Sequence, residues 1–342
     1  MDALLPPSVT EALVADLIMG DAGYPPLDTA YAEAFADVAS ARWGWTLDPA
    51  ATCVCADVLT GISRALELVS QPGETVLVPS PVYMPLLLLP TEIGRRVQQV
   101  PMSPDDRLDL EALATAMAEP GTTALLLCSP HNPHGTVHTP DELRAVAALA
   151  EEHGVGVIVD EIHALVVPAG TVFTPYLAVN DTGLVVTSAS KAYNMAGIKA
   201  AVIVAGTSSR ELLARLPESV KYGAGTFGIR AHVAAWSGGD EWLAAVNANI
   251  VANAAYLGEL LHERLPEVGF RPPASTYLAW LDCRALGLGD DPAAVFLERG
   301  RVALNGGLPF GIAGEGFVRL NLAASRATLA EAVERMARAV GR

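Results

Sequence analysis

The sequence predicts an α/β fold with a mostly parallel sheet, followed by a smaller α+β domain. Short, wholly apolar runs alternate with helix-like segments through the first part of the chain, which is typical of strands that helices cover on both faces. After about residue 207 the alternation stops, and one long helical stretch precedes widely spaced strands. No internal repeat or low-complexity tract is visible, and 342 residues are enough for both domains to bury a core.

The predicted strands of the first domain are apolar along their whole length. They are TVLVP (75–79), ALLLCS (124–129), VGVIVDE (155–161), LVVTS (184–188) and AAVIVAG (200–206). The segment 139–154 between two of them is a predicted helix, because Thr139 can cap it, Pro140 suits its first turn and Gly154 can end it. This order of strand, helix and strand indicates a parallel sheet.

The second domain begins within a long predicted helix over 240–265. The further predicted elements are strands at 276–284, 301–305 and 317–323 and a closing helix at 327–340. We therefore divide the chain into a large domain, residues 20–248, and a small domain formed by residues 1–19 and 249–342.

Composition excludes several classes of function. The net charge of −16 argues against nucleic acid as a partner. The longest aliphatic run, at 85–90, is too short to span a bilayer, and the acidic start lacks the features of a signal peptide. The four cysteines form no disulfide framework and are expected to be core residues in a reducing compartment. These features predict a cytoplasmic protein with no membrane contact.

Polar side chains follow four of the predicted strands. In open α/β sheets, ligands bind beyond the carboxyl ends of the strands. The residues at these ends are Tyr83, Asn132, Asp160 with His163, and Ser188 with Lys191. Each residue alone could have a structural role, such as a helix cap or a turn, but their grouping indicates one ligand site.

This set of residues suits pyridoxal phosphate. A lysine that forms a Schiff base with this cofactor needs a carboxylate at the pyridine nitrogen, and Lys191 and Asp160 provide the two groups. Asn132 and His163 can hydrogen-bond the phenolic oxygen of the ring, and Tyr83 can stack on its face.

The cofactor phosphate needs backbone N–H groups at the start of a helix. The segment 55–69 provides a strand-to-helix turn, so that Val58 and Leu59 become phosphate-binding positions with Asp57 as a helix cap. Ser188 adds a hydroxyl group.

The chain resembles the fold-type-I pyridoxal phosphate enzymes, within the class I/II aminotransferase superfamily. The segments that carry the resemblance are SASKAYNMAGIKA, SPHNPHGTV, DEIH, GYPP (23–26) and GFVRLNLA. Within the superfamily, STYLAWLDCR (275–284) and DEIHA are most similar to the MalY/PatB branch of cystathionine β-lyases.

The resemblance implies a role for individual residues. The implied catalytic residues are Lys191, Asp160 and Tyr83, with Lys191 as both Schiff-base lysine and proton shuttle. Arg319 would bind the α-carboxylate of a small amino acid substrate, beside Asn132. Tyr24 would reach the phosphate of a neighbouring subunit's cofactor, which implies a homodimer with active sites at the interface.

Three features depart from the family pattern. The chain begins almost at its first helix, whereas the family has a segment before it. Lys199 lies where aminotransferases often carry a phosphate-binding arginine and lyases of this branch a neutral residue, so it is either a point charge on the phosphate or a surface residue. Asp57 replaces a glycine, and an anion there is unfavourable for phosphate unless it turns away to cap the helix.

The predicted activity is cleavage of cystathionine or a related L-cysteine conjugate to pyruvate, ammonia and a thiol. An aminotransferase that uses the same residues remains the alternative, and a catalytically idle regulatory protein is a second one. No metal site is expected, because the cluster His131, His134 and His138 lies in an Asn-Pro turn. The glycine-rich segment 305–316 is expected to be a loop over the site rather than a dinucleotide-binding turn.

Overall fold

The computed structural model describes residues 1–25 and 29–342, and within them the large domain contains a seven-stranded sheet. Its strand order is β1-β7-β6-β5-β4-β2-β3. The strands are β1 (Thr52–Cys55), β2 (Thr75–Ser80), β3 (Arg96–Pro101), β4 (Thr122–Cys128), β5 (Gly156–Asp160), β6 (Leu184–Thr187) and β7 (Ala201–Ala205). Every pair is parallel except the two that β7 makes with β6 and β1. The predicted mostly parallel sheet is confirmed.

The five predicted strands of this domain are all present as β2, β4, β5, β6 and β7. The strand β3 was not predicted, because it is an edge strand without an apolar run. Gln98 and Gln99 lie in its middle, and only Val100 is fully buried. An edge strand needs only one apolar contact face, so its sequence lacks the signal of a buried strand.

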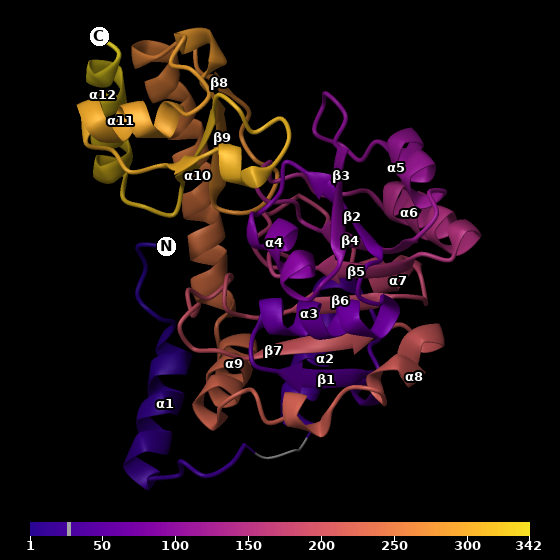
Figure 1. Cartoon of the computed structure of the whole chain (residues 1–342). Helices are drawn as coiled ribbons and strands as arrows, with labels where there is room; N and C mark the ends of the chain where they lie inside the picture. The colour runs from indigo at the N-terminus through magenta and orange to yellow at the C-terminus, as the bar shows by residue number, and fades with distance from the viewer. Residues whose placement is uncertain (26–28) are drawn as a thin grey trace.

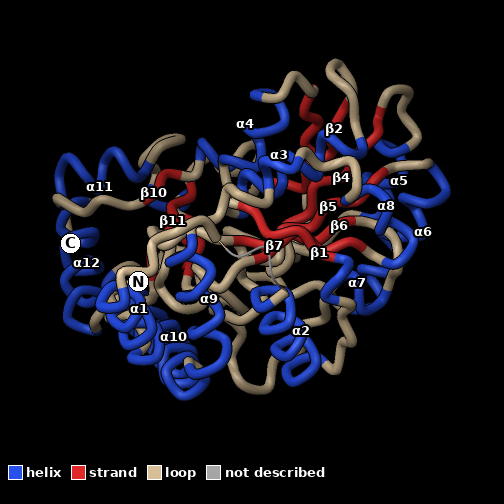
Figure 2. The backbone as a smooth tube through the Cα atoms, turned by 90° about the horizontal axis from the view of Figure 1, so that it is seen from below, coloured by secondary structure: helices blue, strands red, loops and turns tan. Residues whose placement is uncertain are grey.

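Helices cover both faces of the large sheet. They are α2 (Ala30–Trp43), α3 (Val58–Val69), α4 (Pro85–Glu92), α5 (Leu110–Met117), α6 (Pro140–His153), α7 (Tyr176–Val179), α8 (Arg210–Leu213) and α9 (Thr226–Gly238). Figure 2 shows α3 and α4 on one side of the sheet and α2 and α9 on the other. The alternate side chains of each strand therefore belong to two separate apolar cores: Leu126 packs with α3, and Leu125 with the opposite layer.

The helix α6 begins and ends as its sequence predicts. The Thr139 hydroxyl accepts a hydrogen bond from Glu142 N–H at 3.2 Å, and the Glu142 carboxylate accepts one from Thr139 N–H at 2.7 Å. These reciprocal bonds form a capping box. Gly154 ends the helix with φ +67°, a conformation that glycine adopts without strain.

A second, four-stranded antiparallel sheet has the order β10-β11-β9-β8. Its strands are β8 (Gly269–Phe270), β9 (Leu278–Asp282), β10 (Asn305–Gly306) and β11 (Phe317–Asn321), and its helices are α11 (Pro292–Gly300) and α12 (Arg326–Ala339). The long helix α10 (Asp240–Arg264) extends from the large sheet to this second sheet (Figure 1). The first helix, α1 (Pro7–Met19), packs on α9, where Asp16 pairs with Arg230 at 2.7 Å. The residue boundaries of the two domains stay a prediction.

The predicted strand at 301–305 is wrong. Arg301 ends α11 with φ +57°, and Val302 N–H bonds to Phe296 O at 3.1 Å, so these residues form the helix end. Val302 is buried in the core for this reason. Only Asn305 of the predicted strand joins the sheet, opposite Arg319. A helix end with an apolar residue after it has the same sequence pattern as a short strand.

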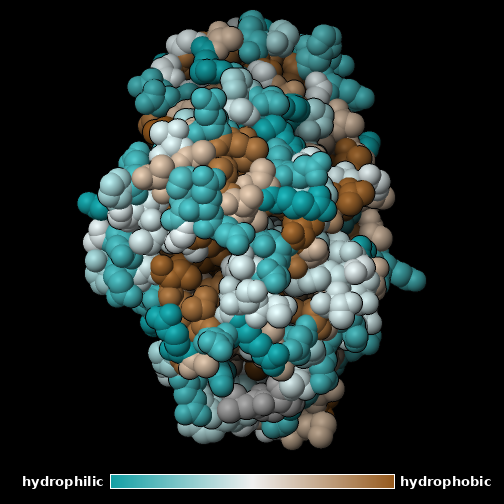
Figure 3. Space-filling view, turned by 90° about the vertical axis from the view of Figure 1, so that its right-hand side faces the viewer, coloured by the Kyte–Doolittle hydropathy of each residue, from teal (hydrophilic) through white to brown (hydrophobic). Residues whose placement is uncertain are grey.

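Figure 3 shows a face of the molecule on which hydrophobic residues lie in small groups between hydrophilic ones. In residues 1–25 and 29–342, no helix combines the length and the apolar composition needed to cross a bilayer. All four cysteines are buried and free.

Candidate active site

A cavity of about 390 Å³ lies beyond the carboxyl ends of β4, β5 and β6 and reaches the second sheet. Every predicted site residue except Tyr24 lines it: Val58, Leu59, Tyr83, Asn132, Asp160, His163, Ser188, Lys191, Lys199 and Arg319. A larger cavity of about 960 Å³ elsewhere in the described chain contains none of these residues. The chemistry predicted from the sequence is therefore gathered in one place, between the two sheets.

Asp160 and Lys191 both line this cavity. Asp160 ends β5, and its Oδ1 accepts a hydrogen bond from Ile162 N–H at 3.1 Å. Burial raises the pKa of Asp160 to about 6, against the effect of the Lys191 charge. Burial also lowers the pKa of Lys191, against the effect of the Asp160 charge and together with the positive charge of Arg319. Burial in this cavity thus favours the neutral form of the Lys191 amine, which can accept a proton. The neighbouring Asp160 carboxylate has little water around it.

His163 is a neutral side chain in this site. Burial lowers its pKa to about 3, and the positive charges of Lys191 and Arg319 add to the effect. Its Nδ1 is buried and has no hydrogen-bond partner among the described residues. The ring also lies edge-on to Tyr277, with 5.9 Å between the centroids.

Arg319 on β11, a strand of the second sheet, places a positive charge in the cavity. Its two terminal nitrogens donate to Asn132 Oδ1 at 2.8 Å and to Asn305 Oδ1 at 2.9 Å. The guanidinium lies 4.8 Å from the centre of the Phe310 ring, a favourable cation–π distance. The guanidinium is therefore held in place, and its buried Nε–H has no protein partner in the described part of the chain.

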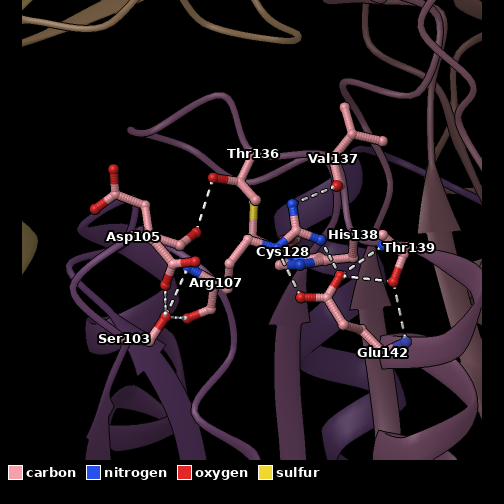
Figure 4. A network of polar contacts seen from close by, with 10 residues as sticks. Ser103, Asp105, Arg107, Cys128, Thr136, Val137, His138, Thr139 and Glu142 are labelled. Carbon is pink, nitrogen blue, oxygen red and sulfur yellow. Dashed lines mark hydrogen bonds and ion pairs between the residues drawn. The ribbon is translucent and has the colours of Figure 1, made fainter.

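The loop that presents Asn132 is fixed from several sides. The backbone carbonyl of Asn132 accepts a hydrogen bond from Tyr83 N–H at 3.0 Å, so these two predicted site residues are linked directly. Figure 4 shows the far end of the loop, where Arg107 donates to Val137 O at 3.1 Å and pairs with Glu142 of the α6 capping box. Because these bonds fix the backbone, the amide of Asn132 is positioned before any ligand binds.

Two of the three histidines of this loop bond to backbone carbonyls, and Nε2 of the third, His134, lies 3.4 Å from Asp106 Oδ1. Nε2 of His131 lies 2.8 Å from Pro81 O, and Nε2 of His138 lies 3.3 Å from Cys128 O. Burial lowers the pKa of His138 to about 3 and that of His134 to about 3. In the residues that the structure describes, no group of three or more histidine, cysteine or acidic side chains is arranged to hold a metal ion.

The amino end of α3 forms another wall of the cavity. Val58 and Leu59 begin the helix, where backbone N–H groups have no partner within the helix. Gly61 brings α3 close to the sheet, since an added Cβ would lie 2.7 Å from a methyl carbon of Val186. Asp57 caps the helix, as predicted, by accepting from Thr60 N–H at 2.8 Å.

The hydroxyl of Ser188 already has partners in the protein. It donates to Ala200 O at 2.8 Å and accepts from Ser190 N–H at 3.1 Å. Ser190, which the sequence analysis did not single out, lines the same cavity. Lys199 also lines it, and its Nζ is 2.7 Å from Asp57 Oδ2.

Tyr24 lies outside this cavity, with 91% of its surface exposed. Its ring meets Tyr222 edge-on, with 6.5 Å between the centroids. The last residue of the GYPP segment, Pro26, is outside the described residues. Tyr24 thus does not line the cavity of its own chain. The resemblance assigns it to the cofactor site of a neighbouring subunit.

Besides Ser190, sequence reasoning missed Tyr277 and Asn305, which also line the site. Tyr277 is buried beside His163, and burial raises its pKa to about 12. Asn305 holds Arg319 from the start of the glycine-rich segment. Tyr277 lies in the segment that carries the resemblance to the MalY/PatB branch, and Asn305 lies in the segment expected to cover the site. Neither residue type indicates a ligand site by itself; its role becomes visible only when the neighbouring strand is known.

The residues present fit pyridoxal phosphate. A flat ring with a basic nitrogen suits the buried carboxylate of Asp160, and a ring oxygen suits the unpartnered imidazole of His163. A phosphate suits the free N–H groups at the start of α3. The amine of Lys191 lies in the same cavity.

The neighbour of Asp160 predicts a pH-dependent stability. Glu161 is fully buried and accepts a hydrogen bond from Tyr176 N–H at 2.7 Å. Burial raises its pKa from 4.5 to about 8, and the negative charge of Asp160 adds to this. At a pH between these two pKa values, Glu161 has lost its proton in the unfolded chain and keeps it in the folded chain. The free energy of unfolding therefore falls as the pH rises through this range.

Glu161→Gln should remove this pH-dependent loss of stability, which reaches on the order of 5 kcal/mol once the pH exceeds both pKa values. The amide can still accept from Tyr176 N–H, so we expect a thermal midpoint several degrees higher near pH 8.5 and nearly unchanged near pH 5. Thermal unfolding followed by circular dichroism checks this, with Glu152→Gln on the exposed side of α6 as the control. A midpoint that falls equally at both pH values would contradict it.

Known proteins share this sequence and fold. The chain matches the family described as aminotransferase class I and II over residues 1–336. A Mycobacterium tuberculosis protein provisionally named a cystathionine beta-lyase is 44% identical over 99% of this chain and 90% of its own length. Cystathionine beta-lyase PatB of Bacillus subtilis is 34% identical over 98% of this chain and 89% of its own. Cystalysin of Treponema denticola, whose crystal structure contains pyridoxal 5'-phosphate, superposes with a TM-score of 0.94 at 25% identity, covering 99% of this chain and 89% of that one.

Proposed function

Because the chain belongs to the aminotransferase class I and II family, in its MalY/PatB branch, we propose that it is a pyridoxal phosphate-dependent carbon–sulfur β-lyase that cleaves cystathionine or a related L-cysteine conjugate. The observation that carries the proposal is that Lys191, Asp160 and Arg319 line one cavity. The products are pyruvate, ammonia and a thiol.

The cofactor, when bound, supplies an electron sink that lets an amino acid lose its α-proton. Asp160 would hold the ring nitrogen, and Asn132 and His163 would hold the ring oxygen. Tyr83 lines the same cavity and offers its aromatic face to the ring. The neutral state of His163 lets one ring nitrogen donate a hydrogen bond without adding a positive charge.

Lys191 moves the proton. The lowered pKa of its buried amine increases the fraction of neutral amine, which can take the proton from the α-carbon of the substrate. The electron pair left behind expels the thiolate from the β-carbon, which breaks the carbon–sulfur bond. Hydrolysis of the remaining three-carbon fragment gives pyruvate and ammonia.

Arg319 orients the substrate. A guanidinium binds a carboxylate with two parallel hydrogen bonds, and Nε with one terminal nitrogen can form such a pair. Asn132 and Asn305 hold the guanidinium before the substrate arrives, so little conformational freedom is lost on binding. The α-carbon is thereby directed at the amine of Lys191.

The cavity supports elimination over transamination of an acidic amino acid. Among the described residues that line it, Arg319 is the one arginine, so a second carboxylate on the substrate side chain would have no guanidinium partner. The thioether sulfur at the bond that is cleaved needs no such partner, and the distal carboxylate of cystathionine is accompanied by an ammonium group of the same substrate.

Incubation with L-cystathionine tests the proposal. We expect pyruvate, ammonia and thiol to form in equal amounts without an added 2-oxo acid, followed by a lactate dehydrogenase assay, an ammonia assay and a thiol reagent. Transamination should be slow and should stop when the cofactor has been converted to its amine form. Steady amino-group transfer to a 2-oxo acid with no pyruvate from any cysteine conjugate would establish an aminotransferase instead, and neither reaction would indicate an idle protein.

The active unit is proposed to be a homodimer. Leu17, Ile18 and Met19 form an exposed apolar end of α1, with exposed fractions of 65%, 81% and 80%, and Tyr24 follows a few residues later. A second copy that covered this surface would bury the apolar side chains and could receive the Tyr24 hydroxyl at its phosphate. The cytoplasm remains the predicted location, supported by four free cysteines.

Tyr24→Phe should weaken cofactor binding without unfolding the protein. Loss of a hydrogen bond to a charged phosphate predicts a Kd for pyridoxal phosphate that is roughly 10- to 100-fold higher. Titration of the apoprotein measures this, and light scattering gives the oligomeric state. Tyr256→Phe on α10 serves as the control. A monomer that stays fully active at high dilution would refute the shared site.

A further inference from the structure

The two unusual residues of the phosphate end, Asp57 and Lys199, form an ion pair. Asp57 Oδ2 is 2.7 Å from Lys199 Nζ, while Oδ1 accepts from Thr60 N–H at 2.8 Å. Burial alone would raise the pKa of Asp57, but the hydrogen bonds from Lys199 and Thr60 hold it below its usual value. The carboxylate is therefore ionised, and each of its oxygens has a partner.

This carboxylate competes with a phosphate for the same helix end. The first N–H groups of α3, at Val58 and Leu59, are free to bind an anion, and Asp57 occupies the third, at Thr60. All of these residues except Thr60 line the cavity. A negative charge next to a phosphate dianion disfavours binding unless a positive charge cancels it.

Lys199 is held by Asp57 and by no other charged group that the structure describes. Its side chain is 63% exposed, and its Nζ makes its hydrogen bond to the Asp57 carboxylate. The interaction raises the pKa of Lys199, so the ammonium stays charged. An exposed lysine tied to one carboxylate differs from a buried lysine directed at a ligand.

We propose that Lys199 promotes cofactor binding through Asp57: its ammonium neutralises the helix-capping carboxylate, so that the cofactor phosphate can share the amino end of α3. The inference rests on the proposed function, because it concerns the phosphate of that cofactor. Asp57 and Lys199 are then positioning residues that act as one unit. Removing the lysine matters only while the carboxylate is present.

A double-mutant cycle on cofactor affinity tests the coupling. Apoproteins of the wild type, Lys199→Gln, Asp57→Asn and the double variant are titrated with pyridoxal phosphate. Asparagine also caps helices, so Asp57→Asn removes the charge and retains the bond from Thr60 N–H. Because neither side chain is part of either apolar core, all variants should fold, which circular dichroism verifies.

We expect Lys199→Gln to raise the Kd about tenfold, and the double variant to bind within about threefold of the wild type. Asp57→Asn alone should bind at least as tightly as the wild type. Pyridoxal, which lacks the phosphate, should show none of these differences. Arg210→Gln is the matched control, because Arg210 pairs at 2.7 Å with Asp48, which caps a turn through Ala50 N–H away from the cavity.

Two results would overturn the inference. An equal loss from Lys199→Gln in both backgrounds would make Lys199 a direct phosphate ligand, and no loss in either would make the pair a surface contact. Failure of the proposed function has a different outcome, since the wild type itself would then not bind pyridoxal phosphate. A wild type that binds the cofactor and cleaves cystathionine, without coupling between the two residues, rejects this inference alone.

Discussion

Lys191→Ala is expected to lose carbon–sulfur cleavage by on the order of 10⁴-fold, the upper end of what a general base contributes. The loss is large because one amine both holds the cofactor and moves the proton. The rate of pyruvate release from cystathionine measures it. Borohydride reduction of the wild-type holoenzyme should also fix the cofactor to the peptide that contains Lys191, and the variant should show no fixed cofactor there.

The composition of the chain makes this test unambiguous. It has three lysines, at positions 191, 199 and 221, so peptide mapping has to distinguish only three sites. Lys221→Ala removes an exposed lysine and should retain full activity. Normal turnover in Lys191→Ala would refute the catalytic assignment as a whole.

Asp160→Ala is expected to lower kcat/KM on the order of 10³-fold. A carboxylate paired with a positive ring nitrogen at about 4 Å contributes roughly 4 kcal/mol in a protein environment, which corresponds to about a thousandfold in rate. Asp160→Glu should retain part of the activity, because it keeps the charge. Steady-state kinetics with cystathionine and the absorption spectrum of the bound cofactor measure both effects.

Asp160→Asn separates the charge from the structural role of the side chain. The amide oxygen can still accept from Ile162 N–H, which Asp160 Oδ1 does at 3.1 Å. A loss in the asparagine variant close to that in the alanine variant assigns the effect to the charge. Mild and equal losses in the alanine and glutamate variants would mean that the carboxylate only supports the backbone.

The large sheet could be predicted because its inner strands are buried on both faces. Such strands are continuous apolar runs; β7 shows this pattern through its whole length, and β5 shows it up to Asp160 at its end. The edge strand β3 and the two-residue strand β10 have no such pattern. Their positions are set by neighbouring strands that are distant in the sequence, which local composition does not report.

The position of the site could also be predicted, because the carboxyl ends of parallel strands meet at one edge of the sheet. Asp160 and Lys191 are placed there by β5 and β6 alone. The family, the cofactor and the type of activity inferred from the motifs are confirmed by the relatives. The individual roles of the site residues stay predictions.

The ion pair between Asp57 and Lys199 could not be predicted as a pair. Each residue was recognised as unusual, but they are far apart in the sequence: Asp57 caps a helix, and Lys199 lies two residues before β7. Their contact depends on how closely α3 packs on the sheet, which the small volume of Gly61 allows. The same limit applies to Asn305, whose contact with Arg319 arises from the pairing of β10 with β11.

The division of the site between two sheets also has a consequence for the order of its synthesis. The predicted cofactor residues that line the cavity lie on or next to the large sheet, and the last of them in the sequence is Lys199, whereas Asn305 and Arg319 are translated near the end of the chain. A growing chain can therefore complete the cofactor side before the substrate side exists. Until β11 has left the ribosome and joined its sheet, the nascent enzyme has no guanidinium in the site for an amino acid's carboxylate, and substrate capture waits for that strand.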